Sequence, residues 1–226
     1  MSRPFDGKLA LVTGASRGLG RAMARRLGAQ GAEVIALART TGALEELDDE
    51  IRAAGGPQAT LVPADITDDP ALERLGLAIH ERWGRLDILV NCAAHAPPLS
   101  PVEHGGKKDL ERTFAVNALG VQRLVRCMDP LMRAAPQAVA VFPADRVNAG
   151  KFHSVYEASK AAAEVFARAW AAETAQANIA VLRPAPPAMD TALRARFRPG
   201  EIRDALPPVD EAAAGIVDAI QAALEG

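Results

Sequence analysis

A glycine-rich turn between an apolar segment and a helix constrains this chain more than any other feature. The turn reads Thr13-Gly14-Ala15-Ser16-Arg17-Gly18-Leu19-Gly20, directly after the apolar run 8–12 and at the start of an amphipathic segment, 18–30. Glycines let the backbone turn sharply and approach a pyrophosphate closely, and a helix N-terminus favours an anion. The spacing is T-G-x-x-x-G-x-G rather than the common G-x-G-x-x-G. Strand, turn and helix nevertheless follow in the order that a dinucleotide-binding motif requires.

The rest of the chain alternates between short apolar runs and longer amphipathic segments. Further strands are predicted over 33–38, 59–63, 86–90, 138–142 and 179–182, and further helices over 42–54, 70–83, 109–134, 154–177 and 210–224. The segment 109–134 is predicted to be one long helix. Near-continuous apolar strands separated by helices are typical of a parallel sheet covered on both faces. We therefore expect an α/β fold, a Rossmann-like doubly wound sheet of about six strands, in a single domain over 1–226.

Composition argues against several classes of partner. The net charge of −2 does not suit a surface that binds nucleic acid. No segment is long enough to span a bilayer and no apolar run at the N-terminus resembles a signal peptide, so we expect no membrane partner and a cytoplasmic location. Cys92 and Cys127 lie far apart, and the four histidines are scattered, so no metal site is expected.

Further motifs follow the predicted strands or lie on the predicted helices. Asp65-Ile66 follows the third strand and Asn91-Cys92-Ala93-Ala94 the fourth, while Asn117 and Tyr156-x-x-x-Lys160 lie on helices. Together with the glycine-rich turn, and in this order, they resemble the short-chain dehydrogenase/reductase family over nearly the whole chain. The resemblance implies an oxidoreductase that transfers hydride between a nicotinamide cofactor and a small carbonyl/alcohol substrate.

The resemblance also implies a cofactor preference. In the family, an Asp at the end of the second strand binds the adenosine ribose and selects NAD, whereas this chain has Ala38 followed by Arg39. Arg17 lies in the glycine-rich turn, and two guanidinium groups can hold a ribose phosphate through forked hydrogen bonds. We therefore expect NADP(H) rather than NAD(H), with Asp65 at the adenine edge and Asn91 under the cofactor. The other cofactor-binding residues that the resemblance implies are Thr13, Gly14, Ser16, Gly18, Leu19, Gly20, Ile66, Ala93, Tyr156, Lys160 and Pro184.

Tyr156 and Lys160 are four residues apart, so they share one face of a helix. A free tyrosine has a pKa of about 10, and a nearby ammonium lowers it by stabilising the phenolate. The pair is therefore a usable acid/base beside a nicotinamide. The resemblance implies that Tyr156 protonates the carbonyl oxygen, that Lys160 binds the nicotinamide ribose, and that Asn117 supports a proton relay through water.

One residue of the family's pattern is missing. The family's catalytic serine lies at the end of the fifth strand, but no Ser or Thr occurs from 139 to 153. The position aligns with Pro143, or with Ala144 or Asp145 if a gap is allowed. Without this hydroxyl donor we expect slow turnover, a different substrate geometry or no carbonyl reduction. Asp145 can replace it only if protonated, or if the substrate is cationic. Two alternatives stay open: imine reduction, and a cofactor-binding protein with weak or no catalysis.

Two expectations concern the remaining sequence. The segment near 185–208 interrupts the pattern of strands and helices, and we expect it to form a substrate lid with a short mobile part over 189–198. The resemblance implies that the two long helices pair across a two-fold axis, so a homodimer is expected. Family members usually add a seventh strand, which we do not find in this sequence, and a tetramer stays an alternative.

Overall fold

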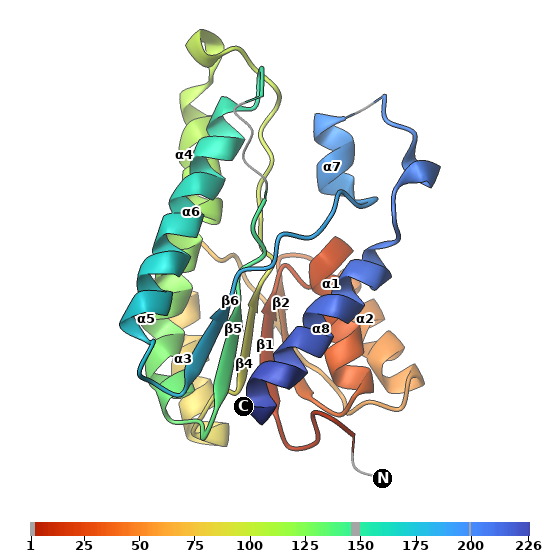
Figure 1. Ribbon diagram of the computed structural model, residues 1–226, viewed down its shortest axis with the longest axis vertical. Helices are drawn as coiled ribbons and strands as arrows, with labels where there is room; N and C mark the ends of the chain where they lie inside the picture. The colour runs from red at the N-terminus through yellow and green to blue at the C-terminus, as the bar shows by residue number, and fades with distance from the viewer. Residues whose placement is uncertain (1–2, 146–149, 199) are drawn as a thin grey trace.

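The computed structural model describes residues 3–145, 150–198 and 200–226. Strands and helices alternate along it, as the sequence predicts (Figure 1). The strands are β1 Leu9–Thr13, β2 Glu33–Ala38, β3 Thr60–Pro63, β4 Ile88–Asn91, β5 Ala138–Val141 and β6 Ile179–Leu182. The helices are α1 Gly18–Ala29, α2 Thr41–Ala53, α3 Asp69–Trp83, α4 Lys107–Asn117, α5 Leu119–Arg133, α6 Ser154–Glu173, α7 Ala192–Phe197 and α8 Val209–Glu225, with short 3-10 helices η1 Val102–His104 and η2 Arg203–Ala205.

The six strands form one parallel sheet in the order β3-β2-β1-β4-β5-β6. At the carboxyl end of β1, Thr13 lies opposite Leu37 of β2 on one side and Asn91 of β4 on the other. The chain runs outward from β1 to β3 and then crosses back to β4, so a crevice forms where the strand order reverses. The sheet confirms the predicted fold, and the edge where such folds bind ligands lies at the ends of β1 and β4.

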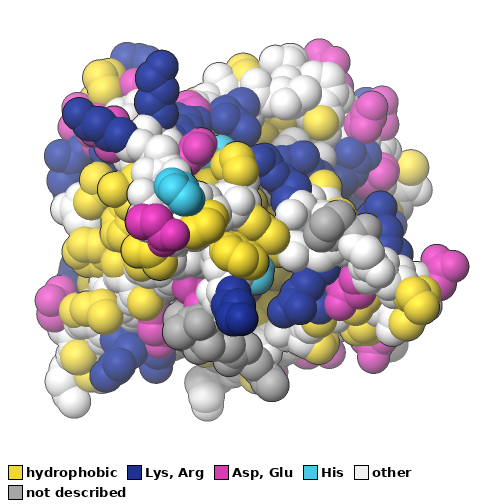
Figure 2. All heavy atoms as spheres, turned by 90° about the horizontal axis from the view of Figure 1, so that it is seen from above, with side chains coloured by type: hydrophobic (Ala, Val, Ile, Leu, Met, Phe, Trp, Pro, Cys, Tyr) yellow, Lys and Arg dark blue, Asp and Glu magenta, His cyan; other side chains and the backbone are white. Residues whose placement is uncertain are grey.

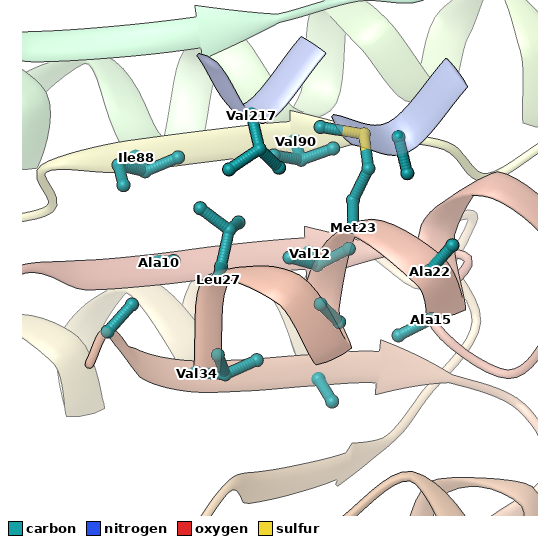
Figure 3. Close-up of a cluster of buried hydrophobic side chains, with 14 of the residues drawn as sticks. Ala10, Val12, Ala15, Ala22, Met23, Leu27, Val34, Ile88, Val90 and Val217 are labelled. Atoms are coloured by element: carbon teal, nitrogen blue, oxygen red, sulfur yellow. The ribbon is translucent and has the colours of Figure 1, made fainter. Parts of the chain in front are cut away.

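Helices cover both faces of this sheet. Helices α1, α2 and α8 pack on one face, and α3, α4, α5 and α6 on the other. Figure 3 shows part of the first layer, where Leu27 of α1 and Val217 of α8 meet the central strands at Ala10 and Val90. All four side chains are fully buried. Because burying apolar surface stabilises a fold by about 25 cal/mol per Å², the central strands are a firm base for the site above them.

The prediction of one helix over 109–134 is wrong, because the helix is interrupted at Ala118. Helix α4 ends at Asn117 and α5 begins at Leu119, and the Ala118 N–H donates to the Phe114 carbonyl. The guanidinium of Arg123 donates to the Ala115 carbonyl at 2.9 Å and satisfies an acceptor beside the break. Neither Ala118 nor its two neighbours is a glycine or proline, and the nearest glycine, Gly120, already lies inside α5.

The glycine-rich turn packs directly against the end of β4. Gly14 has a φ of +66°, and a Cβ there would lie 2.7 Å from the backbone nitrogen of Ala93. A Cβ on Gly20 would overlap the carbonyl oxygen of Gly14. The Thr13 hydroxyl donates to Asn91 Oδ1 at 2.7 Å and accepts from the Ala93 N–H at 3.3 Å. Only glycine fits this approach, which brings the N-terminus of α1 to the crevice.

Large apolar side chains are exposed on the flank formed by α4, α5 and α6. They include Leu110, Leu119 and Val165. The predicted homodimer stays a prediction, and this flank is the surface that it requires. None of the described helices is both long and apolar enough to cross a membrane.

Replacing Gly20 with alanine should lower the free energy of unfolding by roughly 1–3 kcal/mol, because the added methyl group meets backbone that cannot move aside. Urea denaturation followed by circular dichroism measures this change. Gly215→Ala is the matched control, since Gly215 is exposed on α8 and a Cβ there would meet nothing. The control should be as stable as the parent or gain up to about 1 kcal/mol. A Gly20→Ala protein of unchanged stability would contradict the close approach.

Candidate active site

A cavity of about 690 Å³ lies at the carboxyl ends of the strands. Figure 2 shows this end from above, with Lys and Arg side chains gathered beside an area of apolar and His side chains. The predicted site residues that line the cavity are Gly14, Ser16, Arg17, Gly18, Leu19, Gly20, Arg39, Asp65, Ile66, Asn91, Ala93, Tyr156 and Lys160. Thr13 and Pro184 were also predicted to bind the cofactor, but they do not line the cavity. Thr13 is fully buried against Asn91, and the Pro184 carbonyl accepts from the Ala144 N–H at 2.8 Å.

The N-terminus of α1 faces this cavity. Arg17 occupies the N-cap position but makes no capping hydrogen bond with its side chain, and the first turn holds no acidic residue. The first N–H groups of a helix have no partner within the helix and carry partial positive charge. This helix end lies beside glycines, which lack the Cβ that would keep a ligand away from the backbone. It therefore fits the phosphates of a dinucleotide.

Three charged side chains form a cluster at the end of β2 and β3. Asp65 accepts from Arg112 Nη2 at 2.6 Å, and its carboxylate lies 4.0 Å from Arg39 Nη1. Burial raises the pKa of Asp65, but hydrogen bonds from Arg112 and Thr67 outweigh that effect and lower the pKa to about 2. The ionised carboxylate thus holds Arg112 firmly and Arg39 loosely. The sequence analysis missed Arg112, which comes from α4 and has no motif around it.

Tyr156 and Lys160 meet Asp145 at the other end of the cavity. The Tyr156 hydroxyl donates to Asp145 Oδ2 at 2.5 Å, and Lys160 Nζ lies 3.6 Å from the same oxygen. Lys160 also donates to the Pro143 carbonyl at 3.3 Å. Of the three candidates for the missing serine, Asp145 is therefore the one whose side chain contacts the tyrosine. The neighbouring segment 146–149 lies outside the described residues.

The environment of Tyr156 keeps its phenol protonated. Only 7% of the residue is exposed, and burial, the charge of Asp145 and the hydrogen bond to Asp145 all raise the pKa of Tyr156 far above its ordinary value. This effect opposes the pKa lowering that we expected from Lys160. The carboxylate lies between the two groups and accepts from one while neutralising the other.

Asn117 lies at the break between α4 and α5, and its side chain hydrogen-bonds to the backbone of the segment after β4. Its amide nitrogen donates to the His95 carbonyl and to Ser159 Oγ, both at 2.9 Å, and its oxygen accepts from the His95 N–H at 2.7 Å. The side chain therefore fixes the segment after β4, whose His95 lines the cavity. Burial and the charge of Arg112 lower the pKa of His95, so its imidazole is neutral near neutral pH. The relay role of Asn117 stays a prediction.

The segment 185–208, apart from Pro199, which lies outside the described residues, reaches both ends of the cavity. Phe197 of α7 packs on the Tyr156 ring with 4.6 Å between centroids, and Thr191 lies near Gly18. Within the same segment, the Arg194 guanidinium pairs with Glu201 at 2.5 Å. His153, just before α6, lines the cavity and contacts the Phe197 ring edge-on, with 5.4 Å between ring centroids.

Other reactive side chains offer little chemistry here. Burial raises the pKa of the Cys92 thiol to about 12, although Lys160 lowers it slightly, so Cys92 stays protonated and unreactive near neutral pH. Within the described ranges, His, Cys, Asp and Glu form no group of three or more that could hold a metal ion. Tyr156, Lys160 and Asp145 are the ionisable side chains that contact one another at this end of the cavity.

Replacing Asp145 with asparagine should lower the pH at which Tyr156 ionises by about one pH unit or more, because the carboxylate charge that opposes the phenolate is removed. Tyr156 is the chain's single tyrosine, so the ultraviolet absorbance of phenolate reports this group alone. In the parent protein the phenolate should appear well above the ordinary pKa of about 10. Glu157→Gln, which removes another carboxylate from the cavity wall, is the control and should leave the midpoint unchanged. Equal midpoints for parent and Asp145→Asn would refute the contact.

Comparison with known proteins places this architecture in a family. The family model for short chain dehydrogenases matches residues 8–202. A fatty acyl-CoA reductase from Acinetobacter baylyi is 37% identical over 179 residues, which are 77% of this chain and 60% of that protein. A 2,3-dihydro-2,3-dihydroxybenzoate dehydrogenase from Bacillus subtilis is 32% identical over 180 residues, 79% of this chain and 68% of that protein. The match thus spans only 60% and 68% of the length of these two relatives.

Solved structures agree. A short chain dehydrogenase from Pseudomonas syringae superimposes with a TM-score of 0.91 at 28% identity, covering 99% of this chain and 91% of that one. A metagenomic short-chain oxidoreductase solved in complex with NADP superimposes with a TM-score of 0.85 at 27% identity, covering 99% and 94%. With the glycine-rich turn at the end of β1 and Tyr156 one helical turn from Lys160, these matches show that the chain belongs to the short-chain dehydrogenase family of oxidoreductases.

Proposed function

We propose that this protein is an NADP(H)-dependent oxidoreductase that transfers hydride between the nicotinamide and a small carbonyl/alcohol or imine/amine substrate, with Tyr156 and Lys160 at the reacting centre. One observation carries the proposal: the cavity that begins at the glycine-rich turn ends at Tyr156 and Lys160. A single extended ligand therefore has its phosphate site and its reactive end in one continuous space.

The residues along this space fit a dinucleotide phosphorylated on its adenosine ribose. The free N-terminus of α1 suits the pyrophosphate, and Arg17 and Arg39 are exposed at the adenosine end without an acidic residue at the end of β2. Arg39 is 63% exposed and only loosely paired with Asp65, so it is free to take a phosphate. A related structure of 27% identity was solved in complex with NADP, which supports the same choice.

Bound NADP(H) supplies or accepts a hydride at its nicotinamide ring. The chain's own residues do the rest. Lys160, anchored on the Pro143 carbonyl, places a positive charge beside the reacting centre, and Tyr156 contacts the substrate's heteroatom. We propose that residues 185–208 act as a lid over the cavity, because Phe197 packs on the Tyr156 ring and Thr191 lies near Gly18 of the glycine-rich turn. Excluding water from such a site strengthens the electrostatic interactions inside it.

The protein should bind NADPH at least about tenfold more tightly than NADH, because guanidinium–phosphate hydrogen bonds contribute more than ordinary ones. Isothermal titration calorimetry with each dinucleotide measures the ratio. Arg39→Ala should weaken NADPH binding about tenfold and leave NADH binding unchanged. Arg74→Ala, on the exposed side of α3, is the control and should change neither. Equal affinity for the two dinucleotides would disprove the preference, and binding of neither would disprove the proposed function.

Tyr156→Phe should reduce turnover about a hundredfold or more, since the hydroxyl that contacts the reacting heteroatom is gone. The affinity for NADPH should stay within about twofold, because the remaining ring still packs on Phe197 and binding rests on other residues. Steady-state kinetics and calorimetry on the same preparation separate the two effects. A Tyr156→Phe enzyme with the parent rate would show that Tyr156 takes no part in the reaction.

A further inference from the structure

The three acidic side chains that line the described part of the cavity differ in what they face. Asp65 is paired with Arg112, and Glu157 accepts from the Gly150 N–H at 3.2 Å. Asp145 is bound to Tyr156 itself, and its side chain is 47% exposed. A carboxylate therefore reaches the reacting centre and opens onto the space that a substrate occupies.

The direction of the hydrogen bond decides what Tyr156 can offer. A phenol has one hydrogen to donate, and here it points to Asp145 Oδ2 at 2.5 Å. Toward the cavity, Tyr156 then presents only the lone pairs of its oxygen, and the carboxylate beside it presents only lone pairs as well. Lys160 balances the charge of Asp145, but its Nζ is directed at Asp145 and the Pro143 carbonyl. At the substrate's heteroatom the site accepts hydrogen bonds.

A carbonyl substrate does not suit this arrangement. A carbonyl oxygen has no hydrogen, and as hydride reaches its carbon the oxygen must take a proton. If Tyr156 gave that proton, a phenolate would form next to a carboxylate, and two adjacent negative charges strongly disfavour each other. Among the double bonds that accept hydride, a protonated imine is the one whose heteroatom carries both a hydrogen to donate and a positive charge.

We propose that Asp145 and Tyr156 form an acceptor pair that selects a protonated imine, and in the reverse direction an amine, over the corresponding ketone or aldehyde. This inference rests on the proposed function and specifies its substrate class. The N–H of the iminium donates to Tyr156 Oη, and the carboxylate of Asp145, held on the same hydroxyl, stabilises the positive charge.

The reaction balances without any proton transfer to or from Tyr156. Hydride forms a C–H bond at the iminium carbon, and the C=N π pair becomes the nitrogen lone pair. The N–H hydrogen stays on nitrogen and keeps its hydrogen bond to Tyr156 Oη. The substrate is reduced by two electrons, the dihydronicotinamide is oxidised by two, and one positive charge passes from the substrate to the nicotinamide ring. The neutral amine takes up a proton from water after it leaves.

The test compares a cyclic imine with a ketone of the same size. With NADPH, the protein should reduce 3,4-dihydroisoquinoline with a kcat/KM at least about a hundredfold above that for 2-tetralone. Asp145→Ser replaces the acceptor with a hydroxyl donor, and it should shift the ratio toward the ketone by about tenfold or more. Glu157→Gln removes a carboxylate that accepts from the Gly150 N–H rather than from Tyr156, and it should leave the ratio unchanged.

A binding measurement gives a second readout. In the presence of NADP, added 1,2,3,4-tetrahydroisoquinoline, which is a positively charged ammonium ion in neutral solution, should bind at least about tenfold more weakly to Asp145→Asn than to the parent, while NADP affinity stays the same. Two results would overturn this inference: the protein binds NADPH but reduces the ketone as fast as the imine or faster, or it binds NADPH and reduces neither compound. Both results would leave the cofactor proposal intact. Failure to bind NADPH would instead remove the proposed function beneath it.

Discussion

The close approach between the glycine-rich turn and the end of β4 is the contact on which the rest of the site depends. Gly14 and Gly20 leave no room for a Cβ, and the Thr13 hydroxyl bridges to Asn91 across the two central strands. Because α1 begins inside this contact, its positively polarised end is fixed at the crevice. The buried layer that α1 and α8 form beneath this contact resists movement of α1. The core therefore sets the distance between the glycine-rich turn and Tyr156.

The fold was predictable because its signals are local. Strands buried on both faces read as apolar runs, and the bounds of β2 and β6 agree with the sequence prediction at both ends. The break at Ala118 was not predicted, because neither Ala118 nor its two neighbours is a glycine or proline. Its causes come from elsewhere in the chain: Arg123 satisfies the Ala115 carbonyl, and Asn117 is held by His95 and Ser159.

The candidate site divides in the same way. The glycine-rich turn and the Tyr156–Lys160 spacing are short motifs with a fixed geometry, and the cavity contains both. Arg112, Phe197 and Asp145 come from α4, from α7 and from the loop after β5, and only the packed molecule brings them to the site. The sequence offers Asp145 as one of three candidates for a missing serine, but its bond to Tyr156 depends on where the loop after β5 turns.

The exposure of Asp145 has a consequence for isotopes. The carboxylate is about half exposed, whereas the phenol bound to it is almost fully buried. A buried hydroxyl that shares its hydrogen with a solvent-facing carboxylate exchanges that hydrogen with bulk water through a single intermediary. The Tyr156 hydroxyl therefore does not retain its protium in heavy water. If hydride is transferred as we propose, the substrate carbon that receives it is the one position whose hydrogen still reports its source.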